Sequence, residues 1–499
     1  MKKRSCANQK MGLSHFQIIF AYVHSKEIIM VLPEAFVKQI RELSGDESDA
    51  LIAALEQPVP VSVRYNPFKN SENPRTDPVL WSSTGVYLKE RPAFTFDPLL
   101  HAGCYYVQEA SSMFLEQALR EALRISGGDA VRMLDLCAAP GGKSTLAASI
   151  LPKDSLLVAN ELIRTRANIL AENVIKWGSP EVVVTQSDPS SFSGLADFFD
   201  IILTDVPCSG EGMFRKDQGA ISEWSADNVR LCAHRQRDIL SHCWAALRPG
   251  GCLIYSTCTY NTSENEDNIH WICQELGARL LEIPVETEWN ITGSLNPDFN
   301  AAHFPVYRFL PHQTKGEGFF LALLQKTGSD TEAFVKDKGI KNNSVKKNAG
   351  KPVNSSEFSG SIRNLLVNPE NYDFSYDRRG RIRALLKKHI AMISCLEERL
   401  RIVHAGIVLG EMKGKDLLPD ISLALSKDLH RDAVKSFELD LRQAVSYLRG
   451  EAMVLPDSGP LGWVLMCYQG HPLGWMKNIG HRANNAYPNE WRIRSENPY

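Results

Sequence analysis

The chain has 499 residues, a formal net charge of -2 and 43% hydrophobic residues. This length exceeds one ordinary core and suits two or three domains. A net charge this close to zero cannot by itself attract nucleic acid, so any nucleic-acid binding would depend on local basic patches. The eleven cysteines form no CxxC pair, so we expect no metal site, no disulfides and a reducing, cytoplasmic location.

The first 29 residues contain a basic start and a short apolar run, residues 16–23, that Gln17 interrupts. No small-residue cleavage site follows this run, which argues against a signal peptide. No apolar run in the sequence approaches membrane-spanning length. We expect residues 1–29 to be disordered or to be an upstream start, and we expect no membrane association.

Residues 30–125 predict a small α+β accessory region with a helix at 33–43, a strand at 59–65 and a helix at 110–125. Residues 126–326 then alternate between strand and helix. The strands are predicted at 132–136, 155–160, 181–185, 200–204, 251–256, 279–283 and 319–324, with helices such as 145–151 and 164–176 between them. This alternation is typical of a doubly wound, mainly parallel α/β sheet, here of seven strands.

The segment 327–358 is rich in Lys, Asn, Ser and Gly and poor in apolar residues, which predicts a linker. Residues 359–499 follow as a separate predicted domain with strand-like and helical patches and turns rich in Trp and Gly.

A glycine-rich run, CAAPGGKS at 137–144, separates the first predicted strand from its helix. Such a turn lets a nucleotide approach the backbone. An NTP-binding P-loop is excluded because position 137 is Cys where that motif requires Gly, and the dinucleotide fingerprint GxGxxG is absent. Glu161 ends the second strand, where a carboxylate can accept both ribose hydroxyls, and Asp188 follows the third and could accept from an adenine amino group. The set fits an adenosine ligand without a pyrophosphate; the alternative is two ordinary polar loop residues.

Two cysteines follow predicted buried strands: Cys208 in TDVPCSGEG and Cys258 in IYSTCT. Both should lie at the same sheet edge as the glycine-rich run. A thiolate that adds to carbon 6 of a pyrimidine makes carbon 5 nucleophilic toward a methyl donor, and a second thiol can assist release. Asp205 is placed to hydrogen-bond the ring, and Lys143 can supply a cation. The residues alone do not decide which thiol attacks.

We expect most of the other cysteines to be small, buried, apolar side chains of the core. This expectation applies to Cys104, Cys232, Cys243, Cys252, Cys273, Cys395 and Cys467. Cys137 is expected to pack or to line the pocket.

The runs CAAPGGKS, DVPCSGEG and YSTCT resemble the signature motifs of the Sun/Nop family of RNA cytosine-5 methyltransferases. VSVRYNPFK and YYVQEASSM are similar to that family's N-terminal motifs, and GWVLMCYQGHPLGW and NAYPNEWR resemble the C-terminal domain of its bacterial RsmF-like subgroup. The resemblance implies a Rossmann-like class I methyltransferase domain, a small N-terminal α+β domain, a C-terminal PUA-like α+β domain that binds RNA, and S-adenosylmethionine as cofactor.

The resemblance also implies roles for single residues. Cys258 matches the family's nucleophile and Cys208 the cysteine that releases product, whereas in DNA cytosine-5 methyltransferases the Pro-Cys thiol attacks. Lys143 and Asp205 match the cytosine contacts. Ser144 stands where Thr is commoner, which keeps the hydroxyl. The cofactor-binding residues are expected to be Cys137, Ala138, Ala139, Pro140, Gly141, Gly142, Lys143, Glu161, Asp188 and Asp205.

Two groups of cations in the last domain are candidates for binding phosphate, with nearby aromatics that can stack on unpaired bases. They are Arg378, Arg379, Arg381, Arg383, Lys387 and Lys388, and then Lys477, His481, Arg482, Arg492 and Arg494 with Trp475, Tyr487 and Trp491. The alternative is a solvated basic face with core aromatics. Arg64 and Lys69 are weaker candidates.

We therefore expect a monomeric S-adenosylmethionine-dependent RNA cytosine-5 methyltransferase that acts on 16S rRNA or the ribosomal subunit. The target base must leave its stack to reach Cys258. The alternatives are a tRNA cytosine-5 methyltransferase and, in another class, a non-catalytic RNA-binding factor of ribosome assembly. DNA methylation is disfavoured by the extra domain and the second cysteine.

Overall fold

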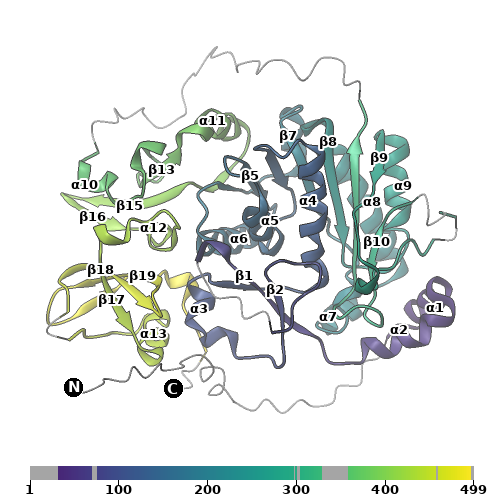
Figure 1. Ribbon diagram of the computed structural model, residues 1–499, viewed down its shortest axis with the longest axis horizontal. Helices are drawn as coiled ribbons and strands as arrows, with labels where there is room; N and C mark the ends of the chain where they lie inside the picture. The colour runs from purple at the N-terminus through teal and green to yellow at the C-terminus, as the bar shows by residue number, and fades with distance from the viewer. Residues whose placement is uncertain are drawn as a thin grey trace, which may run out of the picture.

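The structure is a computed structural model that describes residues 32–69, 76–296, 298–299, 304–328, 358–456 and 459–495. The expected extension 1–29 and nearly all of the predicted linker 327–358 lie outside these residues. A large central sheet is flanked by two smaller sheets from the C-terminal part and by a three-stranded sheet from the N-terminal part (Figure 1).

Five parallel strands form the middle of the central sheet. They are β4 (Arg132–Asp135), β5 (Leu156–Asn160), β6 (Val182–Thr185), β7 (Phe199–Asp205) and β8 (Leu247–Thr257). The order is β10-β11-β8-β7-β4-β5-β6-β14, and β11 (Phe319–Lys326) runs antiparallel to β8. Because β5 and β7 lie on opposite sides of β4, the strand order reverses there, which opens a crevice at the carboxyl ends of the strands.

Alternate residues of these strands enter two separate cores, as the two-residue period of a strand requires. Met133 and Leu203 pack on one face with helices α4 (Leu115–Ile125), α5 (Gly142–Ile150) and α6 (Arg164–Trp177). Leu134 and Ile202 pack on the other with α8 (Ala226–Cys243) and α9 (Glu266–Glu275). Both strand faces are covered, which explains their unbroken apolar runs.

The sheet has nine strands where the sequence predicts seven. The seven predicted strands are present, with β9 at Ala278–Leu281 beside β11. The additional strands are β10 (Tyr307–Phe309), which pairs with β11, and β14 (Ile402–Ala405), which pairs antiparallel with β6. Both are short and lie at the edges of the sheet, where they cover otherwise unpaired backbone groups.

Strand β8 begins at Leu247, four residues before the predicted start at 251. The pairing of β7 with β8 shifts register between Phe199 and Ile201, and Gly250 has a φ of 72°. A glycine absorbs this irregularity inside a continuous strand.

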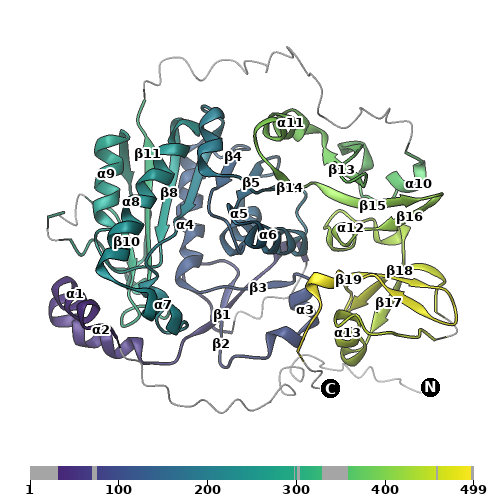
Figure 2. The ribbon, with the colours of Figure 1, turned by 180° about the vertical axis from the view of Figure 1, so that it is seen from behind.

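The N-terminal part contains helices α1 (Glu34–Ser44) and α2 (Ser48–Leu55), a sheet ordered β2-β1-β3, and the short helix α3 (Pro98–His101). The sheet strands are β1 (Val61–Tyr65), β2 (Gly85–Leu88) and β3 (Tyr105–Val107). The predicted helix at 110–125 begins as a 3-10 turn, Ser111–Phe114, and continues as α4. Helices α1 and α2 lie beside α7 (Gln218–Glu223) in both views (Figures 1 and 2).

The C-terminal part contains two four-stranded sheets. The first is ordered β12-β13-β15-β16, with strands at Tyr372–Tyr376, Ile382–Leu386, Ile407–Lys413 and Asp416–Pro419. The second is ordered β17-β18-β19-β20, with strands at Lys435–Leu439, Gly462–Tyr468, His471–Asn478 and Ala483–Asn485. The helices are α10 (Gly360–Arg363), α11 (Ile390–Arg399), α12 (Ile421–Leu425) and α13 (Leu441–Leu448).

These parts share cores. Val63 and Cys104 of the N-terminal part pack with Tyr447 and Met466 of the second C-terminal sheet. Helix α11 packs Leu396 into the core of the central sheet. Residues 359–499 therefore include elements, α11 and β14, that complete the central sheet. Within the described ranges, no helix is long and apolar enough to cross a membrane.

Candidate active site

The two predicted catalytic cysteines lie together at the crevice. Cys208 follows β7 in the Pro-Cys loop (residues 206–213), and Cys258 follows β8 in the Ser-Thr-Cys loop (residues 256–265). Because Asp205 pairs with Ser256 in parallel register, the two loops leave the sheet side by side. The two sulfur atoms are 3.3 Å apart, within hydrogen-bond distance. That hydrogen bond, with burial, raises the pKa of the Cys208 thiol well above its usual value.

The two loops make a close backbone contact that depends on a glycine. The amide of Gly212 donates to the carbonyl of Cys258 at 2.7 Å. A Cβ atom at this position would lie 2.8 Å from that carbonyl oxygen and 2.7 Å from the carbonyl oxygen of Gly318. Only glycine allows this approach without a backbone shift.

Lys143 and Asp205 form an ion pair beside the thiols. Lys143 Nζ lies 2.8 Å from Asp205 Oδ2, and Ser256 Oγ donates to the other carboxylate oxygen at 2.8 Å. Burial lowers the pKa of Lys143, but Asp205, Cys258 and Asp135 together more than offset burial and leave that pKa raised. The lysine therefore stays charged, so a cation and a carboxylate are both fixed at this point of the crevice.

Arg64 supports the glycine loop (residues 137–144) through hydrogen bonds at its C-terminal end. Its guanidinium donates to Gln108 Oε1 at 2.7 Å, to Thr145 Oγ1 at 2.6 Å and to the Gly142 carbonyl at 3.2 Å. The same group lies 4.4 Å from the ring centre of Trp177. Arg64 is only 1% exposed, so the prediction that it binds RNA is wrong. Lys69 is also buried and donates to the Leu425 carbonyl, so that prediction is wrong as well.

Residues at the end of β5 have the character expected of an adenosine site. Glu161 is buried, accepts from the Ile163 amide at 2.9 Å and lies 3.4 Å from Arg166. Leu162 and Ile163, directly after it, are each 51% exposed. A carboxylate beside uncovered apolar side chains suits a ligand with a ribose and a flat ring.

Asp188 is less engaged. Its side chain accepts from the amide and hydroxyl of Ser190, the hydrogen bonds that lower its pKa. The remaining oxygen, Oδ2, is available to a ligand amino group. The cofactor-binding roles of the glycine loop, Glu161 and Asp188 stay a prediction, and the residues present fit S-adenosylmethionine.

Two polar residues at this edge were missed by the sequence analysis. Asn160 donates to the carbonyls of Leu136 and Ser187, and so ties together the loops that follow three strands. Asp135 is fully buried at the end of β4, and its Oδ2 accepts from Ser144 Oγ at 2.6 Å. Its Oδ1 has no hydrogen-bond partner among the described residues. Burial raises the pKa of Asp135 to about 7. Both could have been found in the sequence, because each is a polar residue at the end of an apolar strand, and buried polar groups need hydrogen-bond partners.

The other cysteines mostly match the expectation of small, buried side chains. Cys104, Cys232, Cys243, Cys252 and Cys467 are buried. Cys273 and Cys395 are half-buried and pack against the core that contains α8 and α9, and Cys137 is half-buried in the glycine loop. Among the described residues no cluster of His, Cys, Asp and Glu could hold a metal ion.

The predicted RNA-binding cations fall into two classes. Several are paired: Arg381 with Asp377 and Asp420, Arg383 with Glu397, Lys388 with Asp154 and Glu181, and Lys477 with Asp416. Others are exposed, among them Arg378, Arg379, Lys387, His481, Arg482 and Arg494, and Arg492 is half-buried.

The predicted stacking aromatics are mostly core residues. Trp475 and Tyr487 are buried, and Trp475 donates to the Asp420 carbonyl at 2.9 Å. The prediction that these two rings stack on bases is therefore wrong. Trp491 is half-buried, and Lys176 Nζ lies 5.3 Å from its ring centre.

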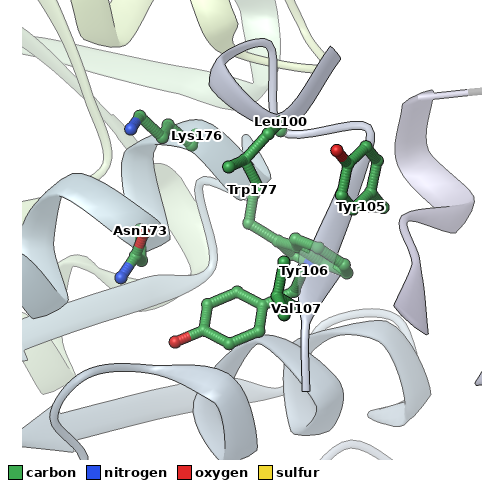
Figure 3. A pocket seen from close by; sticks show the side chains of 8 residues that line it. Leu100, Tyr105, Tyr106, Val107, Asn173, Lys176 and Trp177 are labelled. Atoms are coloured by element: carbon green, nitrogen blue, oxygen red, sulfur yellow. The ribbon is translucent and has the colours of Figure 1, made fainter. Parts of the chain in front are cut away.

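A half-open pocket of about 220 Å³ lies behind the glycine loop, between β3 and α6 (Figure 3). Two of its polar side chains have partners: Asn173 donates to the Pro140 carbonyl at 2.8 Å, and Lys176 pairs with Glu172 at 2.5 Å. The Tyr106 ring lies 3.1 Å from where a Cβ of Gly142 would be. This pocket therefore belongs to the packing that shapes the loop.

Three family models match successive parts of this chain. The family described as "16S rRNA methyltransferase RsmB/F" matches residues 122–325, "N-terminal domain of 16S rRNA methyltransferase RsmF" matches 32–110, and "Methyltransferase RsmF PUA domain" matches 434–493. The crystal structure of a methyltransferase homolog protein from Pyrococcus horikoshii superposes with a TM-score of 0.50 at 25% identity, over 60% of this chain and 96% of that one.

Curated relatives match nearly the whole chain. The ribosomal RNA small subunit methyltransferase F of Aliivibrio fischeri (strain MJ11) is 31% identical over 92% of this chain and 97% of its own length. The protein of that name from Escherichia coli O127:H6 is 32% identical over 92% of this chain and 96% of its own. The chain therefore belongs to the 16S rRNA methyltransferase RsmB/F family of S-adenosylmethionine-dependent enzymes.

Proposed function

We propose that this protein methylates carbon 5 of a cytosine in 16S rRNA through a covalent adduct with Cys258. The observation that supports this chemistry is the pair of thiols 3.3 Å apart beside the Lys143–Asp205 ion pair. Methylation of a nitrogen or oxygen atom needs no thiol, because those atoms already have a lone pair. Carbon 5 has none, and a sulfur nucleophile at carbon 6 supplies the missing electron density.

The roles of the residues follow from their surroundings. Cys258 loses its thiol proton to solvent, and the thiolate adds to carbon 6. Lys143 stabilises the negative charge that develops on the ring, and Asp205 accepts a hydrogen bond from the exocyclic amine. When bound, S-adenosylmethionine supplies an electrophilic methyl group to carbon 5. The proton on carbon 5 is then lost to a base, its electron pair restores the 5,6 double bond, and the bond from carbon 6 to sulfur breaks.

The raised pKa of Cys208 supports its assignment to release. Its hydrogen bond with Cys258 keeps Cys208 protonated at neutral pH, which suits a thiol that assists the departing sulfur better than one that attacks. The match to the RsmF PUA domain and exposed cations such as Arg379 and Arg482 support an RNA substrate. The curated relatives' name supports the small ribosomal subunit as its source, which in a bacterium lies in the cytoplasm.

Two cysteine variants and one matched control test the chemistry. The purified protein is incubated with methyl-labelled S-adenosylmethionine and 16S rRNA or 30S subunits from cells that lack the enzyme. We expect Cys258→Ala to transfer no methyl group, and Cys208→Ala to accumulate a protein–RNA adduct that survives denaturation. Cys232→Ala, a buried cysteine on α8, controls for loss of a thiol and should retain activity.

Three outcomes would change the proposal. If Cys258→Ala still methylates and Cys208→Ala is inactive without an adduct, the two roles are reversed or the adduct does not form. If tRNA alone accepts the methyl group, the proposed 16S rRNA substrate is wrong and the tRNA alternative is correct. If the wild-type protein binds subunits but transfers no methyl group to any RNA, the non-catalytic alternative is correct.

A further inference from the structure

Two buried glutamates, one in each thiol-bearing loop, form hydrogen bonds with the opposite loop. We name Glu211 and Glu264 the glutamate pair; both are fully buried. Glu211 lies three residues after Cys208 yet binds residues that follow Cys258, and Glu264 lies six residues after Cys258 yet binds a residue that follows Cys208. Each loop therefore places a carboxylate in the other.

Glu211 makes the more extensive contacts. Its Oε2 accepts from Thr259 Oγ1 at 2.6 Å, from the Tyr260 amide at 2.7 Å and from the Asn261 amide at 2.9 Å. These are the three residues directly after Cys258. A carboxylate that accepts three hydrogen bonds on one oxygen fixes the path of the backbone around it.

Glu264 makes the reciprocal contacts. Its Oε2 accepts from the Ser209 amide, directly after Cys208, at 3.0 Å and from Gln236 Nε2 at 2.7 Å. The Gln236 amide also donates to the Pro207 carbonyl, directly before Cys208, at 3.0 Å. Asn261 Nδ2 links the pair, at 3.2 Å from Glu211 Oε1 and 2.8 Å from Glu264 Oε1.

The N-terminal helices complete this arrangement from outside the crevice. Gln39 on α1 and Trp224 after α7 each donate to Glu211 Oε1 at 2.9 Å. Phe36, one turn earlier on α1, packs its ring 4.9 Å from Phe214 and 5.6 Å from Trp224. Helix α1 therefore contacts the Pro-Cys loop directly through Gln39.

We propose that Glu211 is a positioning residue that holds the Cys208 and Cys258 sulfurs at the distance needed to release the methylated base, with Gln39 of α1 supporting it. The inference rests on the proposed function for its catalytic consequence only. Among the described residues Glu211 has no cationic partner, and burial of such a carboxylate is unfavourable. Three of the hydrogen bonds that offset this burial come from the residues directly after Cys258. Glu211 and Glu264 are fully buried, so the expected effect is on geometry.

The first test measures the geometry without RNA. Diamide removes one hydrogen from each thiol, is reduced to the hydrazine, and leaves a Cys208–Cys258 disulfide; the sulfurs must close from 3.3 Å to about 2.0 Å. The rate is followed by mass spectrometry of the linked peptide. We expect Glu211→Gln to slow this reaction at least about fivefold, because an amide places N–H donors against donors in a buried site. Glu116→Gln, an equally buried glutamate on α4, should react at the wild-type rate.

The second test separates attack from release. With 16S rRNA, Glu211→Gln should lower turnover by about 10- to 100-fold while the fraction of enzyme in a denaturation-resistant adduct rises, as release becomes slower than attack. A general loss of structure would instead lower adduct and turnover together. Gln39→Ala removes one donor only and should shift both readouts in the same direction by about two- to fivefold.

The outcomes decide between the alternatives. A wild-type crosslinking rate in Glu211→Gln, or an adduct that falls in step with turnover, overturns the proposal. If Glu211→Gln does not fold, Gln39→Ala decides by the same readouts, and no change in either overturns it. If wild type crosslinks readily and Glu211→Gln slowly, but no 5-methylcytosine forms in any RNA, the proposed function fails while the positioning role stands.

Discussion

Replacement of Asp135 by Asn should change how the stability of this protein depends on pH. The carboxyl is buried at the end of β4, and its pKa rises from an ordinary value of 3.8 to about 7. The folded state therefore binds this proton more tightly than the unfolded state, so stability falls as pH rises between about 4 and about 7. A gap of about 3 pH units corresponds to about 4 kcal/mol as an upper limit, at about 1.4 kcal/mol per unit.

The Asn side chain keeps the shape and an acceptor for Ser144 Oγ but does not ionise. We expect the stability of Asp135→Asn to equal or fall below that of wild type near pH 4 and to exceed it near pH 8. Most of this change in relative stability should occur between these two pH values. Differential scanning calorimetry of the cofactor-free protein at one-unit steps from pH 4 to 8 measures this. Ser144→Ala is the control: it removes the hydrogen bond that favours the ionised form, so the total loss of stability should be larger and should continue to higher pH. A melting-temperature difference between Asp135→Asn and wild type that stays constant with pH would refute the reasoning.

Three further predictions follow from the contacts. Arg64→Met should destabilise the protein by about 3–5 kcal/mol, because buried partners lose their donors. The salt dependence of rRNA binding should stay unchanged in filter-binding assays. A weaker salt dependence in the variant would show that Arg64 contacts RNA after all. Gly212→Ala should lower methyl transfer at least about 100-fold, whereas Gly360→Ala, with open space around it, should be neutral; equal activity would contradict the close approach. Arg379→Ala combined with Arg482→Ala should reduce the salt slope of rRNA binding by about 2 with stability within about 0.5 kcal/mol; an unchanged slope places the RNA elsewhere.

Local chain periodicity and strand-end position predicted the central sheet and the thiol pair well. Cys208 and Cys258 each follow an apolar strand, and parallel strands present their carboxyl ends at one edge, so their proximity could be inferred without coordinates. The glycine loop was identified for the same reason. These features depend on short stretches of sequence and on a common topology.

What could not be predicted depends on contacts between distant segments. Arg64 resembles a surface cation until the fold places Gln108 and Trp177 around it. Trp475 lies in a basic, aromatic-rich run, and only the packing of β19 against α12 shows that its ring is in the core. The contact of Gln39 with Glu211 spans 172 positions, and no local pattern marks either residue as its partner.

The late position of α11 and β14 along the chain affects how the enzyme can be made. When synthesis has reached residue 326, the five parallel strands of the central sheet exist, yet β6 still lacks its outer neighbour and the apolar surface that receives Leu396 is uncovered. An open, apolar edge of this kind promotes association between nascent chains. A gene fragment that ends after β11 would keep every catalytic residue but should yield aggregated protein, so the smallest useful expression fragment has to extend past residue 405.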